Sequence, residues 1–230
     1  MIKHYPDMIQ GSEEWYSARC GLLTASEMKL ILTPTLKTAS NDKERAHLDE
    51  LCSQRINKYV EPHYIGDDML RGIADEVDAR ILYEKHYAAV TEVGFITNDK
   101  WGFTLGYSPD ALIGDKGAIE CKSRRQKYQF QTIVSRQMPL EYVLQVQTGL
   151  LVSERDWIDF ISYSAGMPMM TLRVYPDPVV QEAIIQAATV FHKKMDDKLL
   201  DYADALLSDM RLIPTERKIE EKFEMEETNG

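Results

Sequence analysis

The hydrophobic pattern of the chain changes near residue 89, and this change constrains the fold more than any other feature of the sequence. Apolar residues recur at helical spacing before this point, whereas short β-prone runs separated by turn residues follow it. We expect strands at about 90–95, 101–107, 111–113 and 118–122, helices at about 126–136 and 139–153, strands at 157–163 and 169–175, and a final long helix from Asp177-Pro178. This order predicts a mixed α/β domain, with a mixed sheet flanked by helices.

Upstream of residue 89 we expect helices. Ser12 is placed as a helix N-cap, and a short second helix opens at Thr24-Ala25-Ser26-Glu27. Longer helices are predicted over 42–59 and about 67–87. Glu76 lies beside an apolar face of the latter helix, formed by residues that recur every four positions: Met69, Ile73, Val77 and Ile81.

Composition excludes several classes of protein. No apolar run approaches the ~20 residues of a membrane span, and the start lacks the apolar stretch of a secretory signal, so a cytoplasmic protein is expected. The net charge of −10 counts against a protein that coats nucleic acid nonspecifically, but it allows a local basic track. Cys20, Cys52 and Cys121 form no CxxC pair, which argues against a structural zinc site.

The strongest candidate site combines Ser108-Pro109-Asp110 with Glu120-Cys121-Lys122. Side chains alternate along a strand, so Glu120 and Lys122 share one face while Cys121 points to the other. A turn at Gly114–Gly117 would bring Asp110 back beside them. Carboxylate oxygens suit Mg²⁺ or Mn²⁺, and the lysine can steady an attacking water or charge developing on phosphorus.

Each half of this motif also has an ordinary structural explanation. Pro-Asp is common in turns, and Glu-x-Lys is a normal solvated face of a strand. The apolar neighbours Ala118, Ile119 and Cys121 favour a functional explanation, because charged residues on a buried strand need a partner or a ligand.

Beyond this motif, the chain resembles the family of phage lambda exonuclease and other YqaJ-like viral recombinases, which are alkaline exonucleases of the PD-(D/E)xK superfamily. The residues that carry the resemblance follow the family's order across roughly the first two-thirds of the chain: Trp15, Ala18-Arg19, Gly21, Thr24-Ala25-Ser26-Glu27, Gly72, Glu76, Asp78-Ala79-Arg80, Ser108-Pro109-Asp110, Glu120-Cys121-Lys122 and Gln145-Val146-Gln147. The last third matches only in its pattern of two strands and a long helix. The resemblance implies a restriction-endonuclease-like core.

The same resemblance implies the domain organisation. One nuclease domain would span residues 1–210, with a helical part at about 1–88 and the PD-(D/E)xK core at about 89–210. An acidic tail, 211–230, would follow.

The resemblance also implies an active site that holds two Mg²⁺ ions, for which Mn²⁺ can substitute. Asp110 corresponds to the carboxylate shared by both ions, and Glu120 to a ligand of one ion. The backbone carbonyl of Cys121 corresponds to a further ligand. Lys122 corresponds to the residue that orients or activates the attacking water.

Two helix residues complete the implied active site. Glu76 matches an additional acidic residue near the metals, and Gln145 matches a glutamine held near the lysine. A simpler explanation exists for each, because Glu76 can pair with Arg80 one turn later and a glutamine on a helix is usually solvated.

The implied DNA contacts lie in two places. Arg19 and Ser26 match residues that hold a 5′-phosphate, and Thr24 and Ser108 are candidates beside them; the alternatives are a structural arginine and a plain N-cap. The basic run after Lys122 predicts DNA contacts by two further residues, Arg124 and Arg125. This run departs from the lambda sequence, where a proline follows shortly after the lysine, so the individual roles of its residues stay open.

The implied activity is Mg²⁺-dependent 5′→3′ digestion of one strand of linear double-stranded DNA, which releases mononucleotides and leaves a 3′ overhang. The implied partners are DNA ends, a single-strand annealing protein and two further copies of the chain in a trimeric ring, in the cytoplasm of a bacterium that carries the phage. Two alternatives remain at this level: an endonuclease or junction resolvase with the same metal chemistry, and an end-binding protein with a dead site.

Overall fold

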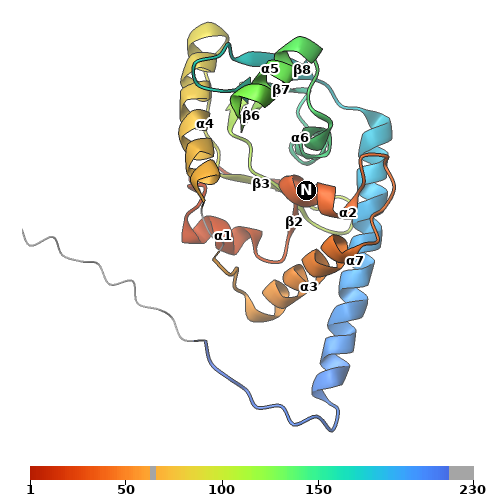
Figure 1. Cartoon of the computed structure of the whole chain (residues 1–230). Helices are drawn as coiled ribbons and strands as arrows, with labels where there is room; N and C mark the ends of the chain where they lie inside the picture. The colour runs from red at the N-terminus through yellow and green to blue at the C-terminus, as the bar shows by residue number, and fades with distance from the viewer. Residues whose placement is uncertain (63–65, 218–230) are drawn as a thin grey trace, which may run out of the picture.

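The computed structural model describes residues 1–62 and 66–217 (Figure 1). Its helices are α1 (Glu13–Arg19), η1 (Ala25–Glu27, a 3₁₀ helix), α2 (Met28–Ile31), α3 (Asp42–Asn57), α4 (Asp67–His86), α5 (Gln126–Ser135), α6 (Leu140–Ser153) and α7 (Pro178–Leu206). Its strands are β1 (Ile2–Tyr5), β2 (Leu23–Thr24), β3 (Phe95–Asn98), β4 (Leu105–Tyr107), β5 (Ala111–Ile113), β6 (Gly117–Ser123), β7 (Trp157–Tyr163) and β8 (Met170–Val174). Residues 218–230 of the predicted acidic tail lie outside the described ranges.

Local sequence signals place several helix starts where they were expected. The hydroxyl of Ser12 accepts from the backbone N–H of Trp15, and the carboxylate of Asp177 accepts from Val179 and Val180 ahead of α7. Pro178 occupies the first turn of α7, where its missing N–H costs nothing. These caps satisfy backbone N–H groups that have no partner inside the helix.

The strands of the described residues form two four-stranded sheets, where the sequence predicted one mixed sheet. In the first, the order is β1-β3-β4-β2; β1 pairs antiparallel with β3 and β2 runs parallel to β4. In the second, the order is β5-β6-β7-β8, with β6 and β7 parallel along seven residue pairs. Both sheets are mixed and flanked by helices, so the predicted fold class is confirmed.

The first sheet shows where the strand predictions were wrong. The predicted N-terminal segment of helices also supplies β1 and β2, two strands that the sequence did not predict. The strand expected at 90–95 lies instead at Phe95–Asn98, and it ends on an asparagine, a residue type that is common in turns. Its side-chain amide is buried and donates to the backbone carbonyl of Val152, 3.2 Å away. A paired amide can occupy a strand that an unpaired one would break.

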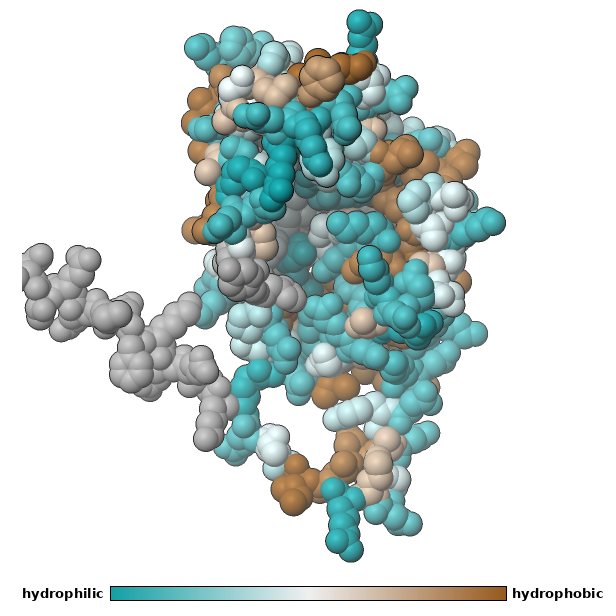
Figure 2. Space-filling model, in the orientation of Figure 1, coloured by the Kyte–Doolittle hydropathy of each residue, from teal (hydrophilic) through white to brown (hydrophobic). Residues whose placement is uncertain are grey.

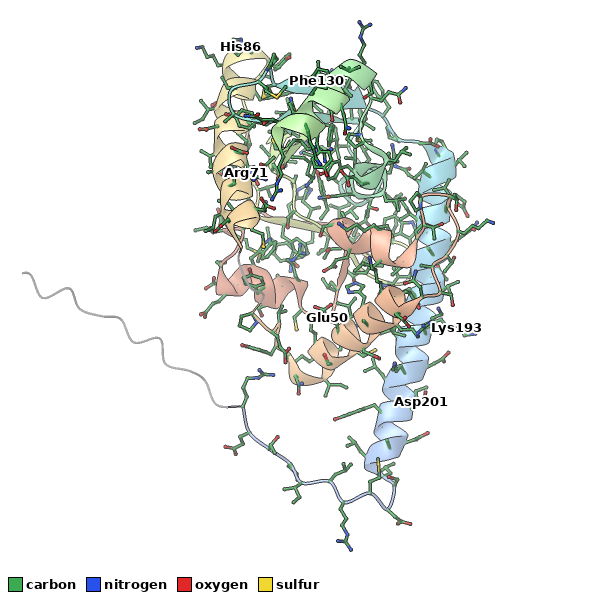
Figure 3. All side chains as sticks on the ribbon, viewed as in Figure 1. Glu50, Arg71, His86, Phe130, Lys193 and Asp201 are labelled. Atoms are coloured by element: carbon green, nitrogen blue, oxygen red, sulfur yellow. The ribbon has the colours of Figure 1, made fainter. Side chains whose placement is uncertain are left out.

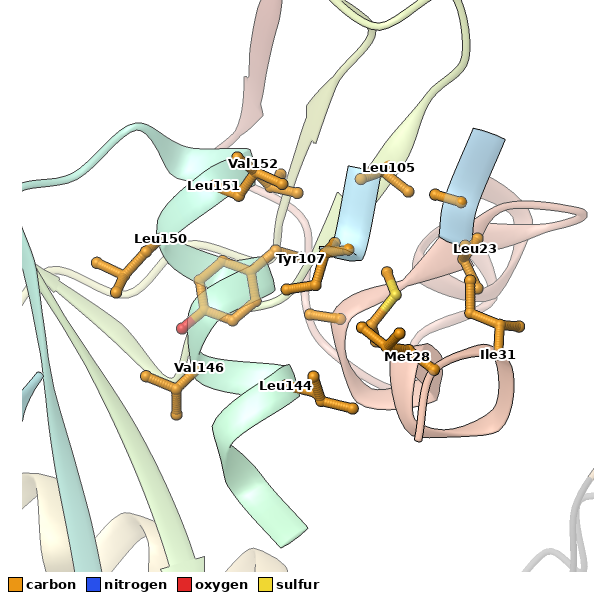
Figure 4. Close-up of a cluster of buried hydrophobic side chains, with 14 of the residues drawn as sticks. Leu23, Met28, Ile31, Leu105, Tyr107, Leu144, Val146, Leu150, Leu151 and Val152 are labelled. Carbon is orange, nitrogen blue, oxygen red and sulfur yellow. The ribbon is translucent and has the colours of Figure 1, made fainter. Parts of the chain in front are cut away.

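Helix α6 joins the two sheets. It contacts β3 and β4 of the first sheet and β7 of the second, and its residues from Val146 to Ser153 are buried. Figure 4 shows Val146, Leu150 and Tyr107 packed together beside this helix. Because α6 is held on several sides, a side chain that it carries has a well-defined position relative to both sheets.

Helix α4 does not pack through its predicted apolar face. That face is exposed: Met69 by 53%, Ile73 by 59%, Val77 by 42% and Ile81 by 59%. The buried side chains are Asp75, Ala79 and Tyr83, and the small Ala79 packs against the second sheet. Tyr83 is held there by a 2.6 Å hydrogen bond to Asp159 on β7. Figure 3 labels Arg71 and His86 along this helix, and Figure 2 shows hydrophobic side chains at its outer edge.

His192 of α7 gives the fold a predicted pH dependence. Burial and the nearby Arg55 guanidinium lower the pKa of His192 to about 4, and its ring stacks on Phe103 with centroids 4.5 Å apart. Histidine in an unfolded chain has a pKa of about 6.5. As the pH falls, His192 is therefore protonated in the unfolded state before it is protonated in the folded state. Stability contributed by the neutral ring is therefore complete above about pH 6.5 and is lost as the pH falls toward 4.

We expect His192→Phe to reduce this loss of stability between pH 7 and pH 4.5, because the replacement ring can stack but cannot titrate. Urea unfolding at the two pH values measures the difference for each protein. An equal difference in the wild type and the variant would contradict the assignment of this pH dependence to His192.

Across residues 1–62 and 66–217, no helix is long and apolar enough to cross a membrane.

Candidate active site

A β-hairpin gathers the three residues at the centre of the predicted site. Strands β5 and β6 pair antiparallel around the expected turn, and the backbone N–H of Asp110 donates to the carbonyl of Ile119 at 3.3 Å. The Asp110 carboxylate in turn accepts from the backbone N–H of Cys121. Lys122 Nζ lies 2.6 Å from Glu120 Oε1. The structure thus brings Asp110, Glu120 and Lys122 together, with Cys121 between the latter two.

Glu120 is the most enclosed member of this group, with a residue exposure of 1%. Its Oε1 accepts from the side-chain amide of Gln145 on α6 as well as from Lys122. Its Oε2 accepts from the hydroxyl of Tyr107 on β4, at 3.0 Å. A buried carboxylate needs such partners, since an unpaired one would carry a large desolvation penalty. Gln145 and Lys122 therefore meet at the same carboxylate oxygen.

The electrostatics of the hairpin reflect crowded carboxylates in a dry environment. Burial raises the pKa of Asp110 well above its usual value, and the carboxylates of Glu120 and Glu76 add to this effect. Burial alone would lower the pKa of Lys122, but Glu120 and Asp110 raise it above its usual value. The lysine is therefore held as an ammonium, which offsets part of the negative charge of the site.

Glu76 approaches the hairpin from α4. Burial raises the pKa of its carboxyl, Arg80 opposes this, and Glu120 adds to it. Arg80 lies 3.5 Å from Glu76, so the simple pair within the helix is also present. However, Arg80 Nη1 also donates to the backbone carbonyl of Asp110 at 3.2 Å. Through this contact α4 is tied to the loop that carries Asp110.

The predicted phosphate-binding residues form a second cluster, around Arg19. The guanidinium of Arg19 lies over the ring of Trp15, with its Cζ 4.1 Å from the ring centroid, and it donates to Thr24 at 3.2 Å and to Ser108 at 3.5 Å. Trp15 Nε1 donates to the same Ser108 hydroxyl at 2.9 Å. Ser26 is exposed, and its hydroxyl lies 3.3 Å from that of Thr24. Ser108 belongs to this cluster and precedes Asp110 by two residues, so the two parts of the site adjoin.

The remaining candidates, Arg124 and Arg125, are each engaged with acidic residues. Arg124 donates to Glu141 and to the hydroxyl of Tyr142, both at 2.6 Å, and Arg125 donates to Asp68 at 2.8 Å. The Arg124 side chain is mostly buried, whereas that of Arg125 is largely exposed. DNA binding by either residue would compete with these pairs, so their roles stay predictions.

Two residues that contact the site were missed as site residues. Tyr107 comes from the strand before the motif, and Arg80 was considered only as a partner of Glu76. Each contacts a residue more than ten positions away in the sequence. Nothing about a tyrosine at the end of a predicted strand indicates that its partner is Glu120. For Arg80, the available signal was its place in the block Asp78-Ala79-Arg80, which follows Glu76 at the spacing of one helical turn.

Two buried carboxylates and a lysine gathered on one hairpin form a candidate catalytic site. The chain belongs to the family of YqaJ-like viral recombinases, whose domain model matches residues 14–156. No curated protein matches the chain. The family predicted from the motifs is therefore confirmed.

Solved structures agree with this assignment. The chain is similar to LHK-Exo, an alkaline exonuclease from Laribacter hongkongensis, with 29% identity and a TM-score of 0.75 over 86% of this chain and 100% of that one. The structure of LHK-Exo in complex with dAMP matches with the same values. A phage-related exonuclease from Haemophilus somnus 129PT shares the fold, with 13% identity and a TM-score of 0.51 over 77% of this chain and 96% of that one. The family match and the similarity to LHK-Exo support a nuclease role in recombination.

Proposed function

We propose that the protein is a Mg²⁺-dependent 5′→3′ exonuclease that digests one strand of linear double-stranded DNA. It releases mononucleotides and leaves a 3′ single-stranded overhang, which a single-strand annealing protein uses in phage-type recombination in the bacterial cytoplasm. The observation that carries the proposal is the hairpin with Asp110, Glu120 and Lys122, in a chain 29% identical to an alkaline exonuclease. The complex of that relative with dAMP supports mononucleotides as products.

The residues of the hairpin suit a divalent cation. Asp110 and Glu120 are buried carboxylates, and Lys122 compensates for part of their charge, so a cation would relieve the remaining repulsion. In the described ranges no three His, Cys, Asp or Glu side chains form a group that could hold a metal ion by themselves. Mg²⁺ does not need one, because it keeps several waters and uses one or two carboxylates together with substrate phosphates. Asp110, Glu120, Glu76 and the Cys121 carbonyl would hold the two ions of the proposed site.

The chemistry divides between the cations and the protein. Bound Mg²⁺ would supply Lewis acidity toward the phosphate and a more acidic water. The Lys122 ammonium donates to the attacking water or to the oxygen on which charge develops, and Gln145 keeps the neighbouring Glu120 in place. Exclusion of bulk water from this buried hairpin strengthens both interactions.

The Arg19 cluster gives the proposed reaction its direction. An arginine stays cationic even though burial lowers the pKa of Arg19, and its planar fork suits a terminal phosphate. The hydroxyls of Thr24, Ser26 and Ser108 add donors nearby. A 5′-phosphate bound there would place the first phosphodiester bond toward Asp110, since Ser108 adjoins it in sequence.

A time course with end-labelled duplex DNA tests this function. With Mg²⁺, a 5′ label should be released at once as a mononucleotide, while a 3′ label stays on long strands until late, and closed circles stay intact. An Asp110→Ala protein, purified in parallel, controls for contaminating nuclease. Nicking of closed circles would instead identify an endonuclease, and an absence of any metal-dependent cleavage would reject catalysis.

We also propose that the working form is a ring of three copies around the DNA. A chain with net charge −10 has little positive surface to hold DNA, and contacts to phosphates weaken steeply with salt. A closed ring would retain the duplex topologically. The exposed apolar face of α4 supports an assembly, because contiguous exposed apolar patches usually mark interaction sites.

We expect sedimentation equilibrium at micromolar concentration to give the mass of a trimer, and Ile73→Glu to shift it toward the monomer, because a charge in an apolar interface is costly. Ile213→Glu, at an exposed isoleucine outside α4, is the matched control. A wild-type protein that is a monomer at this concentration and still digests DNA processively would reject the ring.

A further inference from the structure

Tyr107 lies at the end of β4 in the first sheet, yet its hydroxyl reaches Glu120 on β6 of the second sheet, 3.0 Å from Oε2. The side chain is almost completely buried, with an exposure of 1%. Figure 4 shows its ring against α6 near Val146 and Leu150, with the hydroxyl directed away from the apolar cluster around Leu105. A buried tyrosine hydroxyl normally has a partner, and here that partner is a carboxylate at the proposed metal site.

The two oxygens of Glu120 have different surroundings. Oε2 meets the fully buried hydroxyl of Tyr107. Oε1 meets Lys122, whose side chain is 23% exposed, and Gln145, which is half-buried. A cation that approaches from the side of the partly exposed Lys122 therefore meets Oε1. Oε2 stays fixed against the core.

Gly149 makes room for this tyrosine. A Cβ placed on Gly149 would lie 2.7 Å from Cζ of the Tyr107 ring and 2.9 Å from its Cε2, closer than real contacts allow. A glycine inside a helix is less favourable than an alanine, so α6 is less stable than it could be. The space thus left in α6 is occupied by the ring, and Gln145, one turn earlier on the same helix, bonds to the same carboxylate.

We propose that Tyr107 is a positioning residue of the metal site, which holds Oε2 of Glu120 and so fixes the orientation of the carboxylate that would bind the cation. This inference rests on the proposed function only in its assumption that a divalent cation binds at the hairpin. Donors behind a metal-binding carboxylate orient it, and their removal typically weakens metal binding by about 10- to 100-fold. Tyr107 touches neither the proposed substrate nor the attacking water, so its contribution is to the geometry of Glu120.

Calorimetric titration with Mn²⁺, without DNA, tests the role of the hydroxyl directly. We expect Tyr107→Phe to weaken Mn²⁺ binding by about tenfold or more, because the ring still fills its space while Oε2 loses its donor. The matched control is Tyr83→Phe: Tyr83 is equally buried, and its hydroxyl also donates to a carboxylate, that of Asp159, outside the hairpin. The control should bind Mn²⁺ as the wild type does, whatever its melting temperature.

Nuclease assays separate positioning from a structural role. Tyr107→Phe should need about tenfold more Mg²⁺ for half-maximal rate but should approach the wild-type rate at saturating Mg²⁺. Unchanged Mn²⁺ binding by Tyr107→Phe would overturn the inference. If Tyr107→Phe binds Mn²⁺ more weakly than the wild type but neither protein digests DNA, the inference is supported and the proposed function is rejected.

Gly149→Ala offers a second route to the same oxygen. The added methyl group should displace the Tyr107 ring and weaken Mn²⁺ binding in the wild-type background. In the Tyr107→Phe background it should weaken Mn²⁺ binding little further, because the hydroxyl is already gone. Fully additive losses would show that Gly149 acts on the site by another path and would overturn the link between the glycine and the tyrosine.

Discussion

Replacing Lys122 by alanine is expected to slow DNA digestion by about 100- to 1,000-fold, the usual effect of removing a group that stabilises developing charge in a buried site. Lys122 Nζ lies 2.6 Å from Glu120, and the carboxylates around it hold it as an ammonium. Asp110→Ala is expected to lose at least as much activity, because Asp110 is the carboxylate proposed to bind both cations. Initial rates on 5′-phosphorylated duplex DNA at saturating Mg²⁺ measure both effects.

The fold contains a second ion pair between a lysine and a buried glutamate, which offers a matched control for Lys122→Ala. Lys194 of α7 lies 2.8 Å from Glu44, whose side chain is 3% exposed, much as Lys122 pairs with Glu120. Lys122→Ala and the control Lys194→Ala each leave a buried carboxylate without its cation, so both variants should be destabilised. Only Lys122→Ala should lose nuclease activity. A folded Lys122→Ala protein with the wild-type rate would remove the lysine from the proposed mechanism.

The centre of the site was predictable because its geometry is local. Alternation along β6 places Glu120 and Lys122 on one face, and a short turn returns Asp110 to them within twelve residues. The pairing of β5 with β6 follows from the same turn. The helix N-caps at Ser12 and Asp177 were predictable for a similar reason, since each satisfies N–H groups two or three residues away.

What the sequence did not predict depends on partners far along the chain. The hydrogen bond from Tyr107 to Glu120 joins two sheets, and neither side chain indicates the other. The orientation of α4 could not be predicted for a related reason: the residues that recur every four positions form an apolar face, whereas the helix packs on the second sheet through the small Ala79 and the hydrogen-bonded Tyr83. The exposed stripe that results is informative only once the helix has been placed against the sheet.

The largest expected change in specificity concerns Arg19. We expect the wild type to digest duplex DNA with 5′-phosphate ends faster than DNA with 5′-hydroxyl ends, and Arg19→Ala to abolish that preference. The guanidinium lies over the Trp15 ring and is anchored by Thr24, so binding a ligand would require little further ordering of this side chain. Hydrogen bonds to charged groups contribute about 1.5–3 kcal/mol, which corresponds to a preference of about 10- to 100-fold.

Arg173 provides the control for this prediction, because it also stacks on a tryptophan, with its Cζ 3.6 Å from the centroid of the Trp157 ring, and pairs with a buried carboxylate, Asp159. Arg173→Ala should destabilise the fold and yet keep the ratio of rates on the two kinds of end. Arg19→Ala should bring that ratio close to one while retaining digestion of 5′-hydroxyl ends, since the hairpin with Asp110 and Lys122 is untouched. Equal rates on both ends for the wild type would show that the Arg19 cluster does not bind a terminal phosphate. The direction of digestion would then need another determinant, and the cluster would be a structural support for the loop that carries Ser108.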